Sequence, residues 1–157
     1  MEDRLKQDFT RRLSQCNKGE MIVILYDIVF AYLDEAKAAN TQNNYEAYKI
    51  AIRKADASLQ ELINSLNFAY AISKQLYPLY VYCKRALAKA MYQNKTDGIT
   101  EAETVLRRLY SSFKEAAKSD TSGPLMRNTQ KVYAGITYGK NDLNENYMDT
   151  FQRGFFV

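Results

Sequence analysis

Residues 20–36 read EMIVILYDIVFAYLDEA, and this stretch decides how the chain must fold. Its only charged residues are Glu20, Asp27, Asp34 and Glu35. A helix at the surface of a small globular protein needs a single apolar stripe facing the core. Here the apolar side chains continue almost all the way round. The stretch therefore predicts a helix with two apolar faces, each of which needs a cover.

The apolar residues of this helix divide into two stripes at helical spacing. Each large apolar side chain left in water forfeits about 1.5–3 kcal/mol, so neither stripe is expected to stay bare. Two covers remain open for the second stripe: the chain's own ends, or a helix or extended segment of a partner protein. The first stripe, suited to a core, comprises Ile22, Leu25, Tyr26, Val29, Leu33 and Ala36; the second comprises Met21, Ile24, Ile28 and Tyr32.

A milder second stripe occurs in the helix expected over about 69–93. Its members lie off the core seam and are mostly tyrosines, whose apolar body and hydrogen-bonding tip suit surfaces that are buried part of the time. Core filling with the hydroxyl at the rim is the simpler alternative for any single tyrosine. These residues, Tyr70, Tyr77, Val81 and Tyr82, complete the predicted partner-binding set.

The remaining segments show the three- and four-residue apolar steps of helices. Asn17, with Glu20 three residues later, predicts a capping box that starts the double-faced helix, which then covers about 18–39. A second helix is expected from Asn43–Asn44 to about Leu66. Pro78 falls inside the pattern of the third, which predicts a kink at 74–78 or a start near Tyr77. The expected core seams are Tyr45, Tyr48, Ile52, Ala55, Leu59, Leu62 and Leu66; Ile72, Leu76, Leu79 or Tyr80, Cys83, Leu87 and Ala90; and Ile99, Ala102, Leu106, Leu109, Phe113 and Ala116.

The helix of the last seam is expected over about 99–118, with Thr100 and Glu103 as a second capping box that would start it later. Four helices with short connections predict an all-α protein, an antiparallel up-down four-helix bundle. The expected organisation is an N-terminal segment over 1–16, a bundle domain over 17–118 and a long C-terminal tail over 119–157. In the N-terminal segment, Leu5, Phe9 and Leu13 recur every four residues, as in a short helix that docks by one edge.

The C-terminal tail, residues 119–157, opens with the breaker cluster SDTSGP and is rich in aromatic residues. That content exceeds what a solvating tail needs, so the tail is expected to dock on the bundle. A sharper hypothesis makes it a built-in competitor in a partner groove, which truncation after Ser119 would relieve. The alternatives are a permanent packing strap and self-association through the tail.

Composition argues against several classes of function. The net charge of +4 comes from 22 basic and 18 acidic residues mixed along the chain, so nucleic-acid binding is not expected. There is no histidine, which removes the usual nucleophile–base pairs and most metal sites, and no glycine-rich phosphate loop occurs. We expect no enzyme, cofactor or metal, no membrane span, and two reduced cysteines in a cytoplasmic protein.

The order and spacing of three stretches resemble the flagellar secretion chaperones of the FliS family. LYDIVFAYLDEA at 25–36 resembles that family's first-helix motif, in which Leu-Tyr-Asp leads an apolar helix. IAIRKADASLQELINSLNF at 50–68 resembles its second helix, and 76–116 is similar to its third and fourth. The resemblance covers about 17–118. Departures include Pro78, Val81, and Phe113 where the family commonly has tryptophan.

The resemblance implies a chaperone without catalytic activity. Such proteins bind the disordered C-terminal segment of flagellin in the cytoplasm, prevent its premature polymerisation, and deliver it to the flagellar type III export apparatus. The client wraps around the bundle and forms short helices in apolar grooves. The eight partner-binding residues would then contact flagellin or a segment standing in for it. The alternative is a helical protein-interaction or structural module without a flagellin client.

Overall fold

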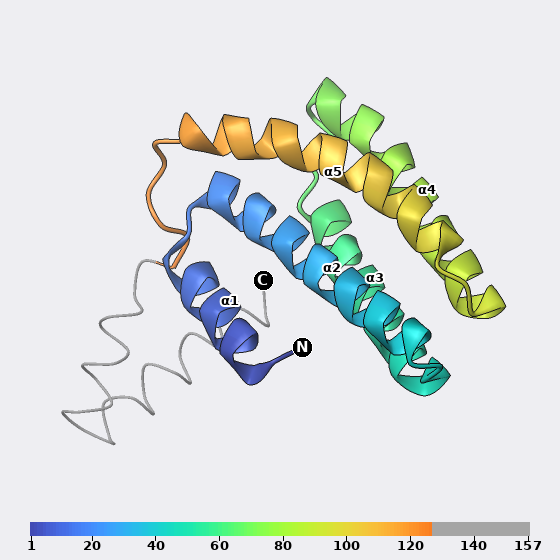
Figure 1. Cartoon of the computed structure of the whole chain (residues 1–157). Coiled ribbons are helices and arrows are strands. Elements are labelled where there is room, and N and C mark those ends of the chain that lie inside the picture. Colours follow the sequence, from blue (N-terminus) through green and yellow to red (C-terminus); the bar gives the residue numbers. More distant parts are fainter. Residues whose placement is uncertain (127–157) are drawn as a thin grey trace, which may run out of the picture.

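The computed structural model describes residues 1–126; the expectations for the rest of the tail fall outside these residues. The described chain is all-helical, which confirms the expected fold class at that level (Figure 1). It forms five helices: α1 (Asp3–Gln15), α2 (Lys18–Thr41), α3 (Tyr45–Asn64), α4 (Ala71–Gln93) and α5 (Asp97–Lys118). The N-terminal segment is thus a helix, as its four-residue apolar spacing predicts.

Asparagine residues begin or end three of these helices. The capping box at the start of α2 is confirmed: the Glu20 amide donates to Asn17 Oδ1 at 2.9 Å, and the Asn17 amide donates to Glu20 Oε2 at 3.0 Å. Asn44 caps α3 by accepting from the Ala47 amide at 3.1 Å. Asn94 ends α4 in the left-handed conformation, with φ of 53°.

Two alternative helix starts that the sequence left open are wrong. α4 begins at Ala71, close to the expected start at about 69, and runs through Pro78, so it does not start near Tyr77. Proline removes only one intrahelical hydrogen bond, and the buried face of α4 continues past it. α5 begins at Asp97, and Thr100 lies inside it, donating from Oγ1 to the Thr96 carbonyl at 3.3 Å. Thr100 therefore does not form a capping box.

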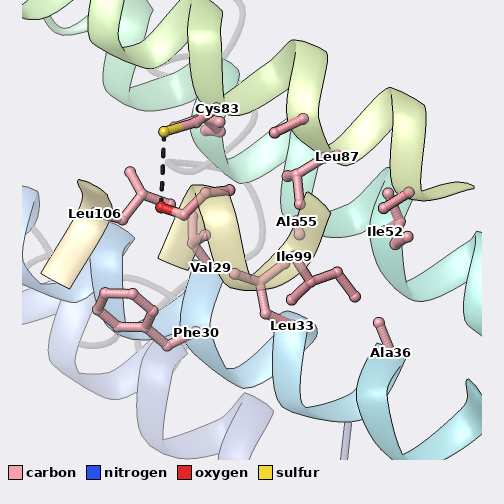
Figure 2. Packing of buried hydrophobic residues seen from close by; sticks show 14 of the residues in the cluster. Val29, Phe30, Leu33, Ala36, Ile52, Ala55, Cys83, Leu87, Ile99 and Leu106 are labelled. Atoms are coloured by element: carbon pink, nitrogen blue, oxygen red, sulfur yellow. Dashed lines mark hydrogen bonds between the residues drawn. The ribbon is translucent and has the colours of Figure 1, made fainter. Parts of the chain in front are cut away.

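The main core lies among α2, α3, α4 and α5. α2 packs on α3 and α5, and α4 packs on α3 and α5, so each helix contacts two of the others. The first stripe of α2 points into this core, as predicted, and meets the seams of the other helices (Figure 2). At its centre the buried Cys83 thiol lies 3.7 Å from the Ala102 carbonyl oxygen. Burial raises the pKa of this thiol to about 12.

Three predicted seam residues are not in the core, because each lies within the first or last turn of its helix. Tyr45, Ile72 and Ala116 are exposed. The open choice on α4 is settled in favour of Tyr80, which is 1% exposed, whereas Leu79 is exposed.

Gly98 lets α4 and α5 approach each other closely. A Cβ atom at this position would lie 2.2 Å from the Ala86 carbonyl oxygen and 3.0 Å from Ala90 Cβ. The first of these atoms belongs to helical backbone and cannot rotate away. The first turn of α5 therefore rests directly on α4.

We expect Gly98→Ala to lower the free energy of unfolding by roughly 1–3 kcal/mol, because overpacking outweighs the gain in helix propensity. Chemical denaturation with far-UV circular dichroism measures this. Gly123→Ala is the control, since a Cβ there has no atom within 4 Å. Equal stability of the two variants would contradict the close approach.

Two buried tyrosines share a hydrogen bond across the core. Tyr26 Oη of α2 and Tyr80 Oη of α4 are 2.7 Å apart, and both residues are almost fully buried. Burial raises the pKa of both phenols, so each stays protonated and one donates to the other. Within the described residues, neither hydroxyl has another hydrogen-bond partner.

Tyr26→Phe should therefore destabilise the fold by roughly 1–3 kcal/mol, because it leaves the Tyr80 hydroxyl unpaired. The double variant Tyr26→Phe/Tyr80→Phe should recover most of that loss, since both polar groups are then gone. A double-mutant cycle of denaturation free energies tests the pair. Additive losses would show that the two hydroxyls do not depend on each other.

Candidate functional site

Three of the four residues of the second stripe of α2, Met21, Ile24 and Ile28, are covered by α1. α1 lies along the first half of α2, outside the group formed by α2–α5 (Figure 1). Their contact forms an apolar cluster separate from the main core. Its buried members are Phe9, Cys16 and Ile24, with Met1, Leu13, Met21, Ile28 and Ala31 packed around them.

Polar contacts at the border of this cluster fix the position of α1. Arg12 Nη2 donates to Asp27 Oδ2 at 2.6 Å, which joins α1 to α2. Tyr110 Oη of α5 donates to the other oxygen of Asp27 at 2.7 Å. Burial, together with the hydrogen bond to Asp27, raises the pKa of Tyr110 to about 12, so this donor keeps its proton. Asp27 thus links three helices.

A groove of about 590 Å³ runs between α1, α2 and α5. Ile24 and Val23 supply apolar lining from α2, and Cys16 lies at the end of α1. Arg12, Lys114 and Lys118 add positive charge, and Glu20 adds a carboxylate. The site therefore combines a partly open groove, lined by Ile24, with the packing of α1 on Met21 and Ile28 of the second stripe.

The structure separates the four predicted partner-binding residues of α2. Of the two covers left open for the second stripe, the chain's own N-terminal end is the one present, because Met21, Ile24 and Ile28 lie in one apolar cluster with α1. Tyr32 instead packs against the main core, with Lys54 Nζ 5.6 Å from its ring centroid. The stripe continues through Ala31, one step of three residues from Ile28, and so turns away from Tyr32. Their partner-binding role stays a prediction.

The predicted residues of α4 lie at a second, open surface. Tyr70, Tyr77 and Tyr82 are exposed, by 65% for Tyr70, and Val81 is half-buried. Tyr77 and Val81 line two adjoining grooves of about 530 and 410 Å³, of which the first also includes Tyr82 and the second lies between α3 and α4. Tyr70 lines neither groove. It is two residues from Phe68 in the chain, and the ring centroids of Phe68 and Tyr77 lie 5.7 Å apart in an edge-on arrangement.

Sequence reasoning missed several residues of this α4 surface. Lys74, Pro78 and Arg85 line the larger groove, and the exposed Phe68 and Ile72 lie nearby in the chain. A signal for the cations was present: every charged residue between Glu61 and Asp97 is basic. Averaging charge over the whole chain concealed this local segregation.

Within residues 1–126, no three potential metal-ligating side chains of the His, Cys, Asp or Glu type gather into a group. In the same part of the chain, none of the helices combines the length and apolar character that a membrane span requires. The two surfaces just described are the candidate binding surfaces taken up below, and both consist of described residues.

The sequence of this chain matches that of a known protein family over most of its described residues. The family described as Flagellar protein FliS matches residues 1–120, and the chain belongs to it. The match includes α1, which the three resembling stretches left out. The flagellar secretion chaperone FliS of Bacillus subtilis (strain 168) is 26% identical over 102 residues, which cover 65% of this chain and 77% of that protein. The family is thus one of flagellar proteins, with a secretion chaperone among its members.

If α1 covers α2 as a separate unit, weakening its apolar contact should expose Cys16 and leave Cys83 protected. We expect Phe9→Ala to raise the labelling rate of Cys16 by a thiol reagent at least about tenfold, because each 1.4 kcal/mol of lost docking energy is tenfold in opening. Mass spectrometry of the labelled peptides measures both rates. Leu5→Ala, at an exposed position of α1, is the control. Parallel acceleration at Cys83 would mean that α1 and the main core open together.

Proposed function

We propose that this chain is a cytoplasmic chaperone that binds the disordered C-terminal segment of flagellin. It keeps the segment from polymerising early and delivers it to the flagellar type III export apparatus. The family membership and the name of the Bacillus subtilis relative support a flagellar chaperone role. The proposal takes α2–α5 as the antiparallel up-down four-helix bundle that the sequence predicts, with α1 outside it.

The observation that carries the proposal is the cover that α1 places on the second stripe of α2. An amphipathic helix in an apolar groove is a recurrent mode of peptide recognition. α1 occupies such a seat, and its cluster is separate from the main core. We infer that α1 stands in for a client helix. When the client displaces α1, Met21, Ile24 and Ile28 become its contacts, while the first stripe of α2 stays buried.

The α4 surface offers the client a second binding site. Tyr77, Val81 and Tyr82 present apolar area beside grooves already open in the structure. Aromatic residues in such places contribute disproportionately to binding energy. A client that wraps around the helices can place one short helix on α2 and an extended or helical piece on α4.

The proposed activity needs no catalytic step. The two oxygens of Asp27 accept hydrogen bonds from Arg12 and Tyr110, so this carboxylate joins helices. The chemistry of the proposal is therefore the exchange of one apolar cover for another.

Isothermal titration calorimetry of the full chain with a purified flagellin C-terminal peptide tests the proposal. We expect a complex, and we expect Tyr82→Ala to weaken it about tenfold or more, as truncation of an aromatic hot spot does. Tyr92→Ala is the matched control, since Tyr92 is also on α4 and is 90% exposed but lines neither groove. Absence of heat and of a complex at tens of micromolar would defeat the proposal.

The same titration, carried out with variants of α1, tests the role of that helix. Phe9→Ala should tighten peptide binding, because the client then displaces a more weakly held helix. The Leu5→Ala control should leave the affinity unchanged. Weaker binding by Phe9→Ala would mean that α1 helps to hold the client rather than standing in for it.

A further inference from the structure

The open groove on α4 combines apolar lining with positive charge that has no ion-pair partner among residues 1–126. Tyr77, Pro78, Val81 and Tyr82 line it, with Lys74 and Arg85 among them. No acidic residue occurs between Glu61 and Asp97, so α4 itself supplies no counter-charge.

The neighbouring helix neutralises only one cation of this surface. Lys84 Nζ donates to Asp56 Oδ2 at 3.1 Å and to Gln60 Oε1 at 2.9 Å, both on α3. Lys74 and Arg85 form no ion pair with any residue of the described part of the chain. The groove therefore suits an occupant with carboxylates beside large apolar side chains.

One stretch of the same chain has that chemistry. Residues 141–151 read NDLNENYMDTF, with three carboxylates and no basic residue. Leu143, Tyr147 and Phe151 recur every four residues, the spacing of one helical face. This acidic and apolar stretch is the complement of the α4 groove in both respects.

We propose that residues 141–151 bind in the groove lined by Lys74, Tyr77, Pro78, Val81, Tyr82 and Arg85 of the same molecule. The apolar face of the stretch packs on Tyr77, Val81 and Tyr82, and its carboxylates pair with Lys74 and Arg85. The inference is independent of the proposed flagellin client, because it needs only the groove and the chain's own residues.

The chain is long enough to make this contact within one molecule. The segment after α5 is held at the start of α2, where the Leu125 amide donates to the Cys16 carbonyl at 3.0 Å. Asn141 lies 15 positions after Met126, which spans up to about 50 Å of extended chain. α5, with 22 residues, is about 33 Å long. A linker of this reach keeps the stretch at an effective concentration near millimolar, so modest intrinsic affinity suffices.

A tryptophan reporter tests the proposal in the full chain, which contains no tryptophan of its own. The parent protein carries Phe151→Trp. We expect its fluorescence maximum at a shorter wavelength than that of the same reporter in a Lys74→Glu/Arg85→Glu background. High salt should move the parent maximum to longer wavelength, because screening weakens the exposed ion pairs.

Charge-reversal variants separate binding from damage to the fold. Lys18→Glu/Arg108→Glu changes the charge equally on exposed residues outside the groove and should leave the parent emission unchanged. Combining Lys74→Glu/Arg85→Glu with Asp142→Lys/Glu145→Lys/Asp149→Lys should restore the short-wavelength emission. The proposal is overturned if the groove variant emits like the parent, if the combined variant does not recover, or if the wavelength of the parent depends on protein concentration. The last result would assign the groove to a second copy of the chain.

Discussion

The constraint on which the structure depends is that α2 is apolar around most of its circumference. A helix of this kind is stable in water only when both of its faces are covered. α3 and α5 cover the first stripe and build the main core with it. α1 covers the second except for Tyr32, through a smaller cluster built around Phe9, Cys16 and Ile24. The path of the chain before and after residue 17 follows from this one requirement.

The two covers differ in how firmly they are held, and that difference connects the fold to the proposed function. The main core is closed by helices that each contact two others, by the Tyr26–Tyr80 hydrogen bond, and by the close approach at Gly98. α1 has one extensive neighbour, and it is held at its border by Arg12 on Asp27. The Met1 ammonium on Glu35 Oε2, 2.6 Å away, is a second polar contact that holds the N-terminal end. Under the proposed function, a client segment with a better apolar face replaces α1 and leaves the Tyr26–Tyr80 hydrogen bond of the main core in place.

The competitor role expected for the tail would act at the α4 surface in the same way, and truncation after Met126 rather than after Ser119 would test it. Asp120 Oδ2 accepts from the Gly19 amide at 2.9 Å and must be kept.

Much of the fold followed from the sequence, because core positions repeat at helical spacing over long stretches. The first stripe of α2, the capping box at Asn17 and most seam residues needed only that periodicity. Helix ends were less predictable: Thr100 and Glu103 have capping-box spacing, yet Glu103 instead accepts from Lys37 and Arg107. The segment that covers the second stripe could not be assigned. The spacing of Leu5, Phe9 and Leu13 predicts a docking helix but does not specify the surface on which that helix packs. Tyr32 was misplaced because a step of three residues and a step of four both look helical. The α4 cations were missed because the whole-chain charge balance conceals a stretch without carboxylates.

Hydrogen–deuterium exchange of the full chain, alone and with a flagellin C-terminal peptide, tests the central claim most directly. The claim is that α1 occupies a seat on α2 that a client takes over. The account predicts that amides of α1 lose protection in the complex, while the amides of α2 beside Tyr26, Val29 and Leu33 keep or increase theirs. Unchanged or greater protection of α1 in a saturated complex would contradict it, because the second stripe would then belong to α1 permanently.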